Sequence, residues 1–217
     1  MISATRAVVL NHLRYGESSI IAQMYTERFG RQSVLVKGVY SRKSPYRAAF
    51  FQPLHIVETT LHHRDNRRIQ RISDIQMLYP FRDILFHPAK NSIALFIAEI
   101  LSKTLKEEES NHALFGFLLQ TIQTLDLLET GIANFHLIFL LHYTRYLGFY
   151  PHLEEFPVSD ASMLSQLLDL SFEHPDKLCF NHHQRNSFTE FLLSYYALHV
   201  DNFGKIRSFP VLQHVFS

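Results

Sequence analysis

The 217-residue chain is poor in the residues that common enzyme motifs require: it has one cysteine, no tryptophan and seven glycines. A single cysteine excludes an intrachain disulfide and a zinc site built from several thiolates. The glycines are too widely spaced for the loops that bind dinucleotides or nucleotide phosphates, and neither HExxH nor GxSxG occurs. The sequence therefore predicts no catalytic residues.

Long apolar runs are also missing. No stretch approaches the roughly 18 residues of a membrane-spanning helix, and the first residues lack the pattern of a secretion signal. A content of 47% hydrophobic and 19% charged residues is enough for a core and excludes a disordered chain. With one cysteine, a reducing compartment is expected, and we predict a soluble cytoplasmic protein with no membrane partner.

Charge is distributed unevenly along the chain, although the formal net charge is only +1. Residues 1–80 hold 12 Lys or Arg and 5 Asp or Glu, a net charge of +7, whereas residues 81–217 hold 9 and 15, a net charge of −6. Halves of opposite sign indicate two domains with different partners.

The positive charge lies in two basic segments. The first contains Arg28, Arg31, Lys37, Arg42, Lys43 and Arg47, and the second contains Arg64, Arg67, Arg68 and Arg71. Such a surface favours a polyanion, and the plainer alternative is a solvated face that aids solubility. We expect Lys37, Arg42, Lys43 and Arg47 to contact phosphate first, with the others secondary. Tyr40 and Tyr46 are candidates for base stacking or for packing.

The first 80 residues predict five strands joined by short connections. The expected strands are Ala7–Leu10, Ile20–Tyr25, Ser33–Val39, Phe50–Leu61 and Arg68–Met77, with a turn at Gly30 and a hairpin tip at Arg64–Arg67. Five antiparallel strands of this length close into a small barrel, and the OB-fold is the common basic one. Residues 1–80 are therefore predicted to be a nucleic-acid-binding OB domain.

After Tyr79 the hydrophobic period becomes helical. Helices are expected over residues 88–106, 111–129, 134–147, 160–172 and 181–202, followed by an extended tail, Phe209–Phe216. His136 and His142 lie on the most apolar of these helices and are predicted to be core or interface residues, in contrast to metal ligands. The fold class is thus α+β, an N-terminal OB barrel followed by an all-α domain over residues 81–217.

Several short motifs occur in a characteristic order. They are Arg14–Ser19, Thr26-Glu27 with Gly30, Val36-Lys37-Gly38, Ser41–Ser44, Phe51–Leu54, and Leu147-Gly148-Phe149 with Pro151. In this order and spacing, over the whole chain, they resemble the RecO family of bacterial recombination mediators.

The resemblance implies a non-enzymatic protein of DNA repair. Members of the family have an OB domain and a helical domain, bind single- and double-stranded DNA and anneal complementary strands. They work with RecR in the RecF pathway, contact the C-terminal tail of single-strand-binding protein and indirectly help to load RecA. By resemblance, the same partners and a place at the nucleoid are expected here.

One departure concerns metal. Many members carry a four-cysteine zinc site after the Leu-Gly-Phe turn, where this chain has His152 and no cysteine. Only Cys179 remains, and His182 and His183 are near it in the sequence. His174 and His152 are further candidates for zinc ligands. We interpret the zinc site as lost and expect no cofactor.

The acidic helical half suggests a protein-docking module, with an apolar groove and a local cation for the acidic tail. The cations available are Arg145, Lys177, Arg185, Lys205 and Arg207. Two other classes of function remain open: a pure adaptor that binds acidic proteins, and an RNA-binding OB protein without a repair role, since the sequence does not show whether a 2′-hydroxyl is read.

Overall fold

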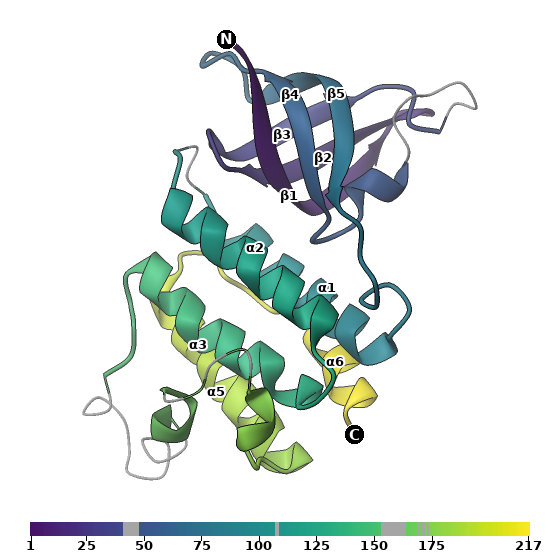
Figure 1. The fold of residues 1–217 in the computed structure, drawn as a ribbon. Coiled ribbons are helices and arrows are strands. Elements are labelled where there is room, and N and C mark those ends of the chain that lie inside the picture. Colours follow the sequence, from purple (N-terminus) through teal and green to yellow (C-terminus); the bar gives the residue numbers. More distant parts are fainter. Residues whose placement is uncertain (41–47, 107–108, 153–163, 169, 171, 173) are drawn as a thin grey trace. The chain divides into compact units, whose positions relative to one another are not determined.

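The computed structural model of the chain describes residues 1–40, 48–106, 109–152, 164–168, 170, 172 and 174–217. The strands are β1 (Ile2–Tyr15), β2 (Ser19–Thr26), β3 (Gly30–Val36), β4 (Ile56–His62) and β5 (Ile69–Tyr79). The helices are α1 (Pro88–Thr104), α2 (His112–Leu127), α3 (Phe135–Leu147), α5 (His182–His199) and α6 (Phe209–Val215) (Figure 1). The short 3-10 helices are η1 (Ala48–Phe51), η2 (Ile132–Asn134) and η4 (Pro175–Lys177). In the described part of the chain, no helix combines the length and apolarity that a membrane crossing requires.

The five strands form a closed barrel in the order β1-β2-β3-β5-β4. All neighbouring pairs are antiparallel except β3 and β5, which run parallel, so the prediction of five antiparallel strands is wrong for this one pair. Alternate residues point inward, so aliphatic side chains such as Val9, Ala22, Val34 and Val57 fill the interior. These observations confirm the predicted α+β class with an N-terminal five-stranded OB barrel.

Three strands differ clearly from the sequence prediction. β3 spans Gly30–Val36 in place of the predicted Ser33–Val39. β1 extends well beyond Ala7–Leu10, because its first half pairs with β4 and its second half with β2. The predicted strand Phe50–Leu61 is wrong at its start, since η1 occupies Ala48–Phe51 and β4 begins at Ile56. Leu54 has a φ of 62°, a left-handed conformation that a strand does not contain.

Helix ends in the second half follow local signals in the sequence. Asn111 Oδ1 accepts the Leu114 N–H at 2.9 Å and caps α2, as predicted. Gly148 ends α3 with a φ of 81°, which glycine adopts without strain. The predicted extended tail Phe209–Phe216 is wrong, because Phe209–Val215 form α6 with a proline in the first turn, where its missing N–H has no cost. Residues 164–168 are helical, and the rest of the helix expected over residues 160–172 lies mostly outside the described residues.

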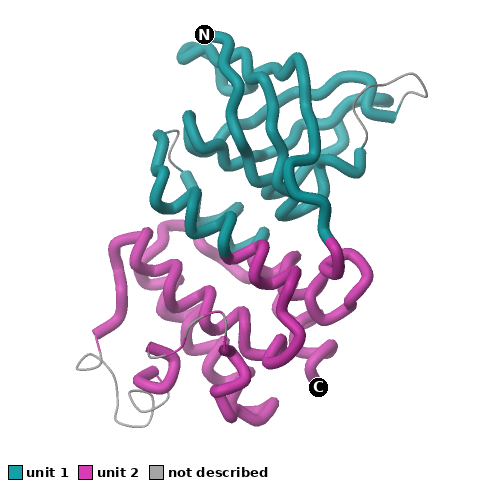
Figure 2. The backbone as a smooth tube through the Cα atoms, in the orientation of Figure 1, with its two compact units in different colours: residues 1–81, 98–120 teal, residues 82–97, 121–217 magenta. Residues whose placement is uncertain are grey.

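The chain divides into two compact units (Figure 2). The barrel unit contains residues 1–81 and 98–120, and the helical unit contains residues 82–97 and 121–217. The division falls inside α1 and α2, so the end of α1 and the start of α2 belong with the barrel. The division of the sequence into domains at residues 80 and 81 stays a prediction.

The helical unit has charged side chains in its interior. Asp126 is 1% exposed, and its carboxylate accepts the backbone N–H groups of Arg82, Asp83 and Ile84 at 2.9, 3.0 and 2.9 Å. Lys90, also buried, donates to the Asp126 carbonyl oxygen at 2.8 Å and pairs with Asp83 at 2.7 Å. The segment before α1 is thereby attached to α2 by polar contacts.

Of the two histidines, His136 is buried in the helical unit and His142 is half-buried. His136 is 2% exposed, and its Nε2 lies 2.9 Å from the Thr189 hydroxyl. Burial lowers the pKa of His136 to about 3, so the ring is neutral in the folded protein. His142 Nε2 lies 3.0 Å from the Leu170 carbonyl oxygen, and burial lowers its pKa as well.

Candidate nucleic-acid interface

The two basic segments of the sequence meet where β3 and β5 run side by side. Leu35 of β3 is paired with Arg71 of β5, and Lys37 directly follows β3. Lys37 and Arg71 line one open depression of about 170 Å³ with Leu35, Val36 and Ile72. Both cationic side chains are exposed. The parallel pairing therefore brings one residue of each basic segment into a single surface feature.

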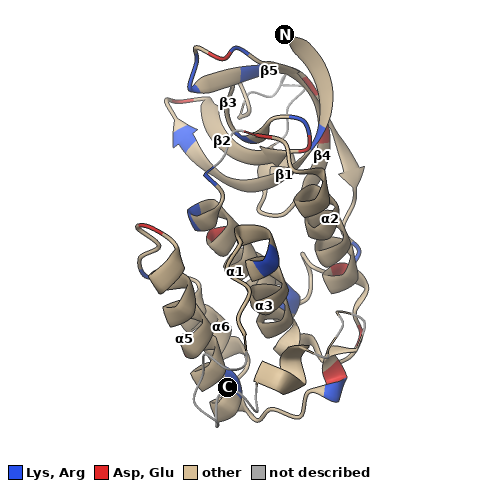
Figure 3. Cartoon of the chain, turned by 90° about the vertical axis from the view of Figure 1, so that its left-hand side faces the viewer, with Lys and Arg blue, Asp and Glu red and all other residues tan. Residues whose placement is uncertain are grey.

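The turn between β4 and β5 presents three more arginines of the second basic segment. Arg64, Arg67 and Arg68 are exposed, with Asp65 as the one carboxylate among them. The side-chain amide of buried Gln70 accepts the Arg64 N–H at 2.9 Å and donates to the carbonyl oxygens of Arg64 and Arg67 at 2.9 and 2.7 Å. Figure 3 shows the cations on the barrel strands and on the turns between them. A fixed turn backbone that carries three guanidinium groups favours a polyanion.

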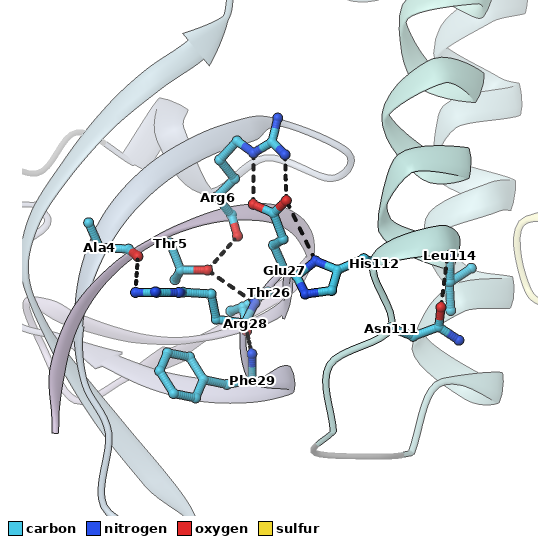
Figure 4. Close-up of polar contacts among 10 residues, drawn as sticks. All are labelled: Ala4, Thr5, Arg6, Thr26, Glu27, Arg28, Phe29, Asn111, His112 and Leu114. Carbon is cyan, nitrogen blue, oxygen red and sulfur yellow. Dashed lines mark hydrogen bonds and ion pairs between the residues drawn. The ribbon is translucent and has the colours of Figure 1, made fainter.

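Arg28 lies at the other end of β3, in the turn that follows β2. Its guanidinium turns back toward β1 and donates to the Ala4 carbonyl oxygen at 3.4 Å (Figure 4). It also donates to the Ser3 hydroxyl. The residue is exposed. Because Lys37 follows the opposite end of β3, the structure does not gather Arg28 and Lys37 into one cluster.

Arg31 is committed to contacts within the barrel unit. Its guanidinium donates to the Ser102 carbonyl oxygen at 2.9 Å, to the Leu105 carbonyl oxygen and to the Gln23 side chain. The first two acceptors lie at the C-terminal end of α1, where carbonyl groups lack helical partners. Burial lowers the pKa of Arg31. Arg31 thus holds the end of α1 against β3 and is already engaged by three acceptors, while its assignment to the interface stays a prediction.

The remaining first-choice residues of the first basic segment lie outside the described residues: Arg42, Lys43 and Arg47, together with Tyr46. Tyr40 is described and is 49% exposed. The Arg14 guanidinium lies 5.4 Å from the centre of the Tyr40 ring, a cation–π contact. Arg14 was not among the residues selected from charge clustering, because its contact with Tyr40 joins segments far apart in the sequence.

The carboxylate next to the first basic segment is neutralised by an arginine (Figure 4). Glu27 accepts hydrogen bonds from Arg6 at 2.8 and 2.5 Å, and His112 Nδ1 lies 3.9 Å from the same carboxylate. The hydrogen bonds lower the pKa of Glu27 and raise that of Arg6. The pair stays ionised with no net charge, so it does not cancel the field of the exposed cations.

The candidate zinc ligands named from the sequence do not form a cluster among the described residues. Within the described residues, no three His, Cys, Asp or Glu side chains group closely enough to hold a metal ion. Cys179 is exposed, and His152, His174 and His182 form no such group with it. The described side chains therefore do not fit a four-ligand site, and the loss of zinc stays a prediction.

The helical unit has an apolar depression of about 430 Å³ beside α5. Its lining includes Leu193, Ala197, Phe203, Ile206, Phe209 and Pro210, with Lys205 and Glu190 as the charged residues. Of the other cations considered for docking, Arg185 is buried and donates to the Phe180 and Phe216 carbonyl oxygens, and Arg145 stacks over Tyr150 at 4.3 Å. The depression thus combines an apolar surface with one candidate cation.

Comparison with known proteins gives a family match for both halves of the chain. Residues 1–81 match the family described as "Recombination protein O N terminal", and residues 85–156 match "Recombination protein O C terminal". "DNA repair protein RecO" of Phocaeicola vulgatus is 33% identical over 241 residues, with 100% of both chains covered. The proteins of the same name from Flavobacterium psychrophilum and Azobacteroides pseudotrichonymphae are 34% and 31% identical, with 98% and 100% of both chains covered. The resemblance found in the sequence is confirmed, and the chain belongs to the Recombination protein O (RecO) family.

Proposed function

We propose that the protein is a non-enzymatic recombination mediator that binds single- and double-stranded DNA through its barrel unit. Membership of the family supports a role in DNA repair by recombination, and the relatives are named as repair proteins and not after a reaction. The observation that carries DNA binding is the convergence of Lys37 and Arg71 in one open depression. Lys and Arg contact phosphates, which positions a strand without reading its sequence.

The proposal includes the steps that the family implies. The protein anneals complementary strands, works with RecR in the RecF pathway and helps to load RecA on DNA coated with single-strand-binding protein. Its place of action is the cytoplasm, at the nucleoid. Family membership supports these steps, while the exposed cations of the barrel unit support strand binding itself.

The salt dependence of DNA binding tests the interface. Each phosphate neutralised on a single strand adds roughly −0.7 to the slope of log affinity against log salt, so replacing Lys37, Arg42, Lys43 and Arg47 by Ala should flatten the slope by about 2–3. The pair Lys37→Ala and Arg71→Ala should flatten it by about 1.4. Lys177→Ala with Lys205→Ala is the charge-matched control in the helical unit. If the salt slope is unchanged in folded variants, these cations do not contact phosphate, and Arg64, Arg67 and Arg68 become the next candidates.

An annealing assay tests the function as a whole. Complementary strands coated with single-strand-binding protein are mixed with the full chain, and duplex formation is followed over time. Acceleration on DNA that exceeds any on RNA of the same sequence supports a recombination mediator. Equal binding of RNA without annealing would favour the RNA-binding alternative.

For the acidic tail of single-strand-binding protein, we propose the apolar depression with Lys205 as the docking site. The apolar lining suits the apolar end of the peptide, and Lys205 suits its acidic residues, with Glu190 as the one carboxylate of the lining. Lys205→Glu should weaken binding of a tail peptide to the full chain, whereas Lys177→Glu, an exposed change outside the lining, should not. If both variants bind the tail peptide equally well, the tail does not dock beside Lys205.

A further inference from the structure

The outer face of the barrel carries a line of apolar side chains that ends in a cation. Leu13 of β1 is paired with Ile21 of β2, Ile21 with Leu35 of β3, and Leu35 with Arg71 of β5. Directly paired residues project from the same face of a sheet. The four side chains therefore form one row across four strands, a width of roughly 14 Å for three strand spacings.

A second pair of residues extends this row. Tyr15 follows Leu13 by two positions in β1 and so shares its face. Lys37, directly after β3, lines one depression with Leu35 and Arg71. Leu13 and Tyr15 are 65% and 57% exposed, which is high for such large apolar side chains. We call Leu13, Tyr15, Ile21, Leu35, Lys37 and Arg71 the open platform; it contains no carboxylate.

The same strands are covered at their other end by the helices of the barrel unit. Val8 is paired with Tyr25 and Tyr25 with Arg31, and the first two are fully buried. The Tyr25 ring lies 6.4 Å from that of Phe115 in α2, and Asn11 donates to the Ser102 hydroxyl of α1 at 3.0 Å. The cover thus reaches Asn11, and Leu13 is the first exposed residue beyond it.

We propose that the open platform binds a short run of unpaired nucleotides, with bases against Leu13 and Tyr15 and phosphates at Lys37 and Arg71. The proposal rests on the DNA-binding function above and names the part of the barrel that distinguishes single strands from duplex. Charge complementarity selects the occupant: exposed apolar side chains beside two cations suit a ligand that is anionic and also has flat apolar faces. Unpaired nucleotides have both, whereas a duplex hides its base faces in the stack.

The helical cover over part of the face limits the length of the site. OB domains contact roughly 4–16 nucleotides of single strand, and their strand face and loops form the binding surface. Because α1 and α2 cover one end of that face, we expect contact with only a few nucleotides, near the short end of this range. The three arginines of the β4–β5 turn would then meet phosphates beyond the platform.

The test uses the full chain with two oligonucleotides of equal length and charge, oligothymidine and an abasic strand. Loss of base stacking on one aromatic side chain should make Tyr15→Ala bind oligothymidine roughly 5- to 150-fold more weakly. Tyr15→Phe should keep the affinity, and Leu198→Ala is a matched change at an exposed apolar residue of α5. The salt slope and the affinity for the abasic strand should stay the same in all of these variants, since no cation is removed.

Three outcomes distinguish this proposal from the proposed function. If Tyr15→Ala and Leu13→Ala keep the preference for oligothymidine over the abasic strand while Lys37→Ala with Arg71→Ala flattens the salt slope, DNA binding stands and the platform is overturned. If the variants keep oligothymidine binding but lose an acidic peptide, the face is a protein surface and the platform is again overturned. If the unaltered chain binds neither strand, the proposed function fails first.

Discussion

The barrel unit and the helical unit place their charged groups differently. Among the described residues, the barrel unit buries no Lys, Arg, Asp or Glu, and Lys37 and Arg71 project from its outer face. The helical unit instead buries Asp126, Lys90 and Arg185. The exposed cations of the barrel are therefore available to a ligand, whereas the buried charges of the helical unit are committed to holding the fold.

The difference follows from how each unit pairs its backbone. A closed barrel pairs its strands with one another and leaves no open edge. The segment before α1 has backbone N–H groups that no strand or helix pairs, and three of them point to the Asp126 carboxylate. Buried backbone donors need acceptors, so the helical unit uses a buried charge where the barrel uses its sheet.

The largest effect is expected from removing that carboxylate. Asp126→Ala leaves three backbone N–H groups without their charged acceptor and should lower the free energy of unfolding by about 3–5 kcal/mol. Asp65→Ala removes a fully exposed carboxylate of the barrel unit and should leave the free energy of unfolding nearly unchanged. Urea unfolding measures both. Similar losses in the two variants would contradict the contrast between the units.

The next effect is the pH dependence that His136 of the helical unit contributes. The pKa of His136 is lowered to about 3 by burial, so between about pH 6.5 and 3 the unfolded chain binds a proton that the folded chain does not. Stability should therefore fall as the pH falls below about 6.5, by about 1.4 kcal/mol per pH unit once well below it. From pH 7 to pH 5 this group should account for a loss of about 2 kcal/mol.

Comparison of His136→Gln with the unaltered chain isolates this contribution, since the variant should lose about 2 kcal/mol less between the same two pH values. His183→Gln, at an exposed position of α5, serves as the matched control. An NMR titration of the ring gives a readout that does not depend on how well the variant folds. A His136 ring that titrates near pH 6.5 would contradict the prediction.

A smaller effect contrasts two cations at opposite ends of β3. Arg31→Ala leaves the Ser102 and Leu105 carbonyl oxygens without their donor and should cost about 1–3 kcal/mol of stability. Lys37→Ala should cost less than about 0.5 kcal/mol. For DNA binding the order reverses, because only Lys37→Ala should flatten the salt slope. A flattened salt slope in folded Arg31→Ala would show that Arg31 contacts phosphate and would contradict this prediction.

The parts of the fold that were predicted correctly depend on local pattern. Alternation of apolar residues predicts the strands and hence the barrel, Asn111 predicts the start of α2, and Gly148 predicts the end of α3. The wrong predictions depend on tertiary context. The apolar run from Phe209 reads as extended, but it forms α6 and its first ring lies 6.4 Å from Phe96, a partner that local sequence does not reveal.

The candidate site shows the same limit. Clustering of charge includes Lys37, Arg71 and Arg31 among the candidate DNA-binding residues. The spacing of cations along the chain does not show which of them contacts the end of α1. The open platform is also invisible in the sequence. Leu13 and Tyr15 have the composition of core residues, and only the strand register together with the extent of the helical cover shows that they are exposed.

The smallest expected effect is that of metal removal. A structural zinc ion contributes directly to folding, so a chain that held one would lose stability in a chelator. In the described part of the helical unit, Cys179 and the neighbouring histidines form no ligand group, and buried contacts such as those of Asp126 and His136 hold the unit together. The melting temperature should be the same with and without EDTA, and elemental analysis should find no zinc. A relative that carries the four cysteines should lose stability under the same treatment. One equivalent of zinc per chain, together with a lower melting temperature in EDTA, would show that the helical unit depends on a metal as well as on buried charge.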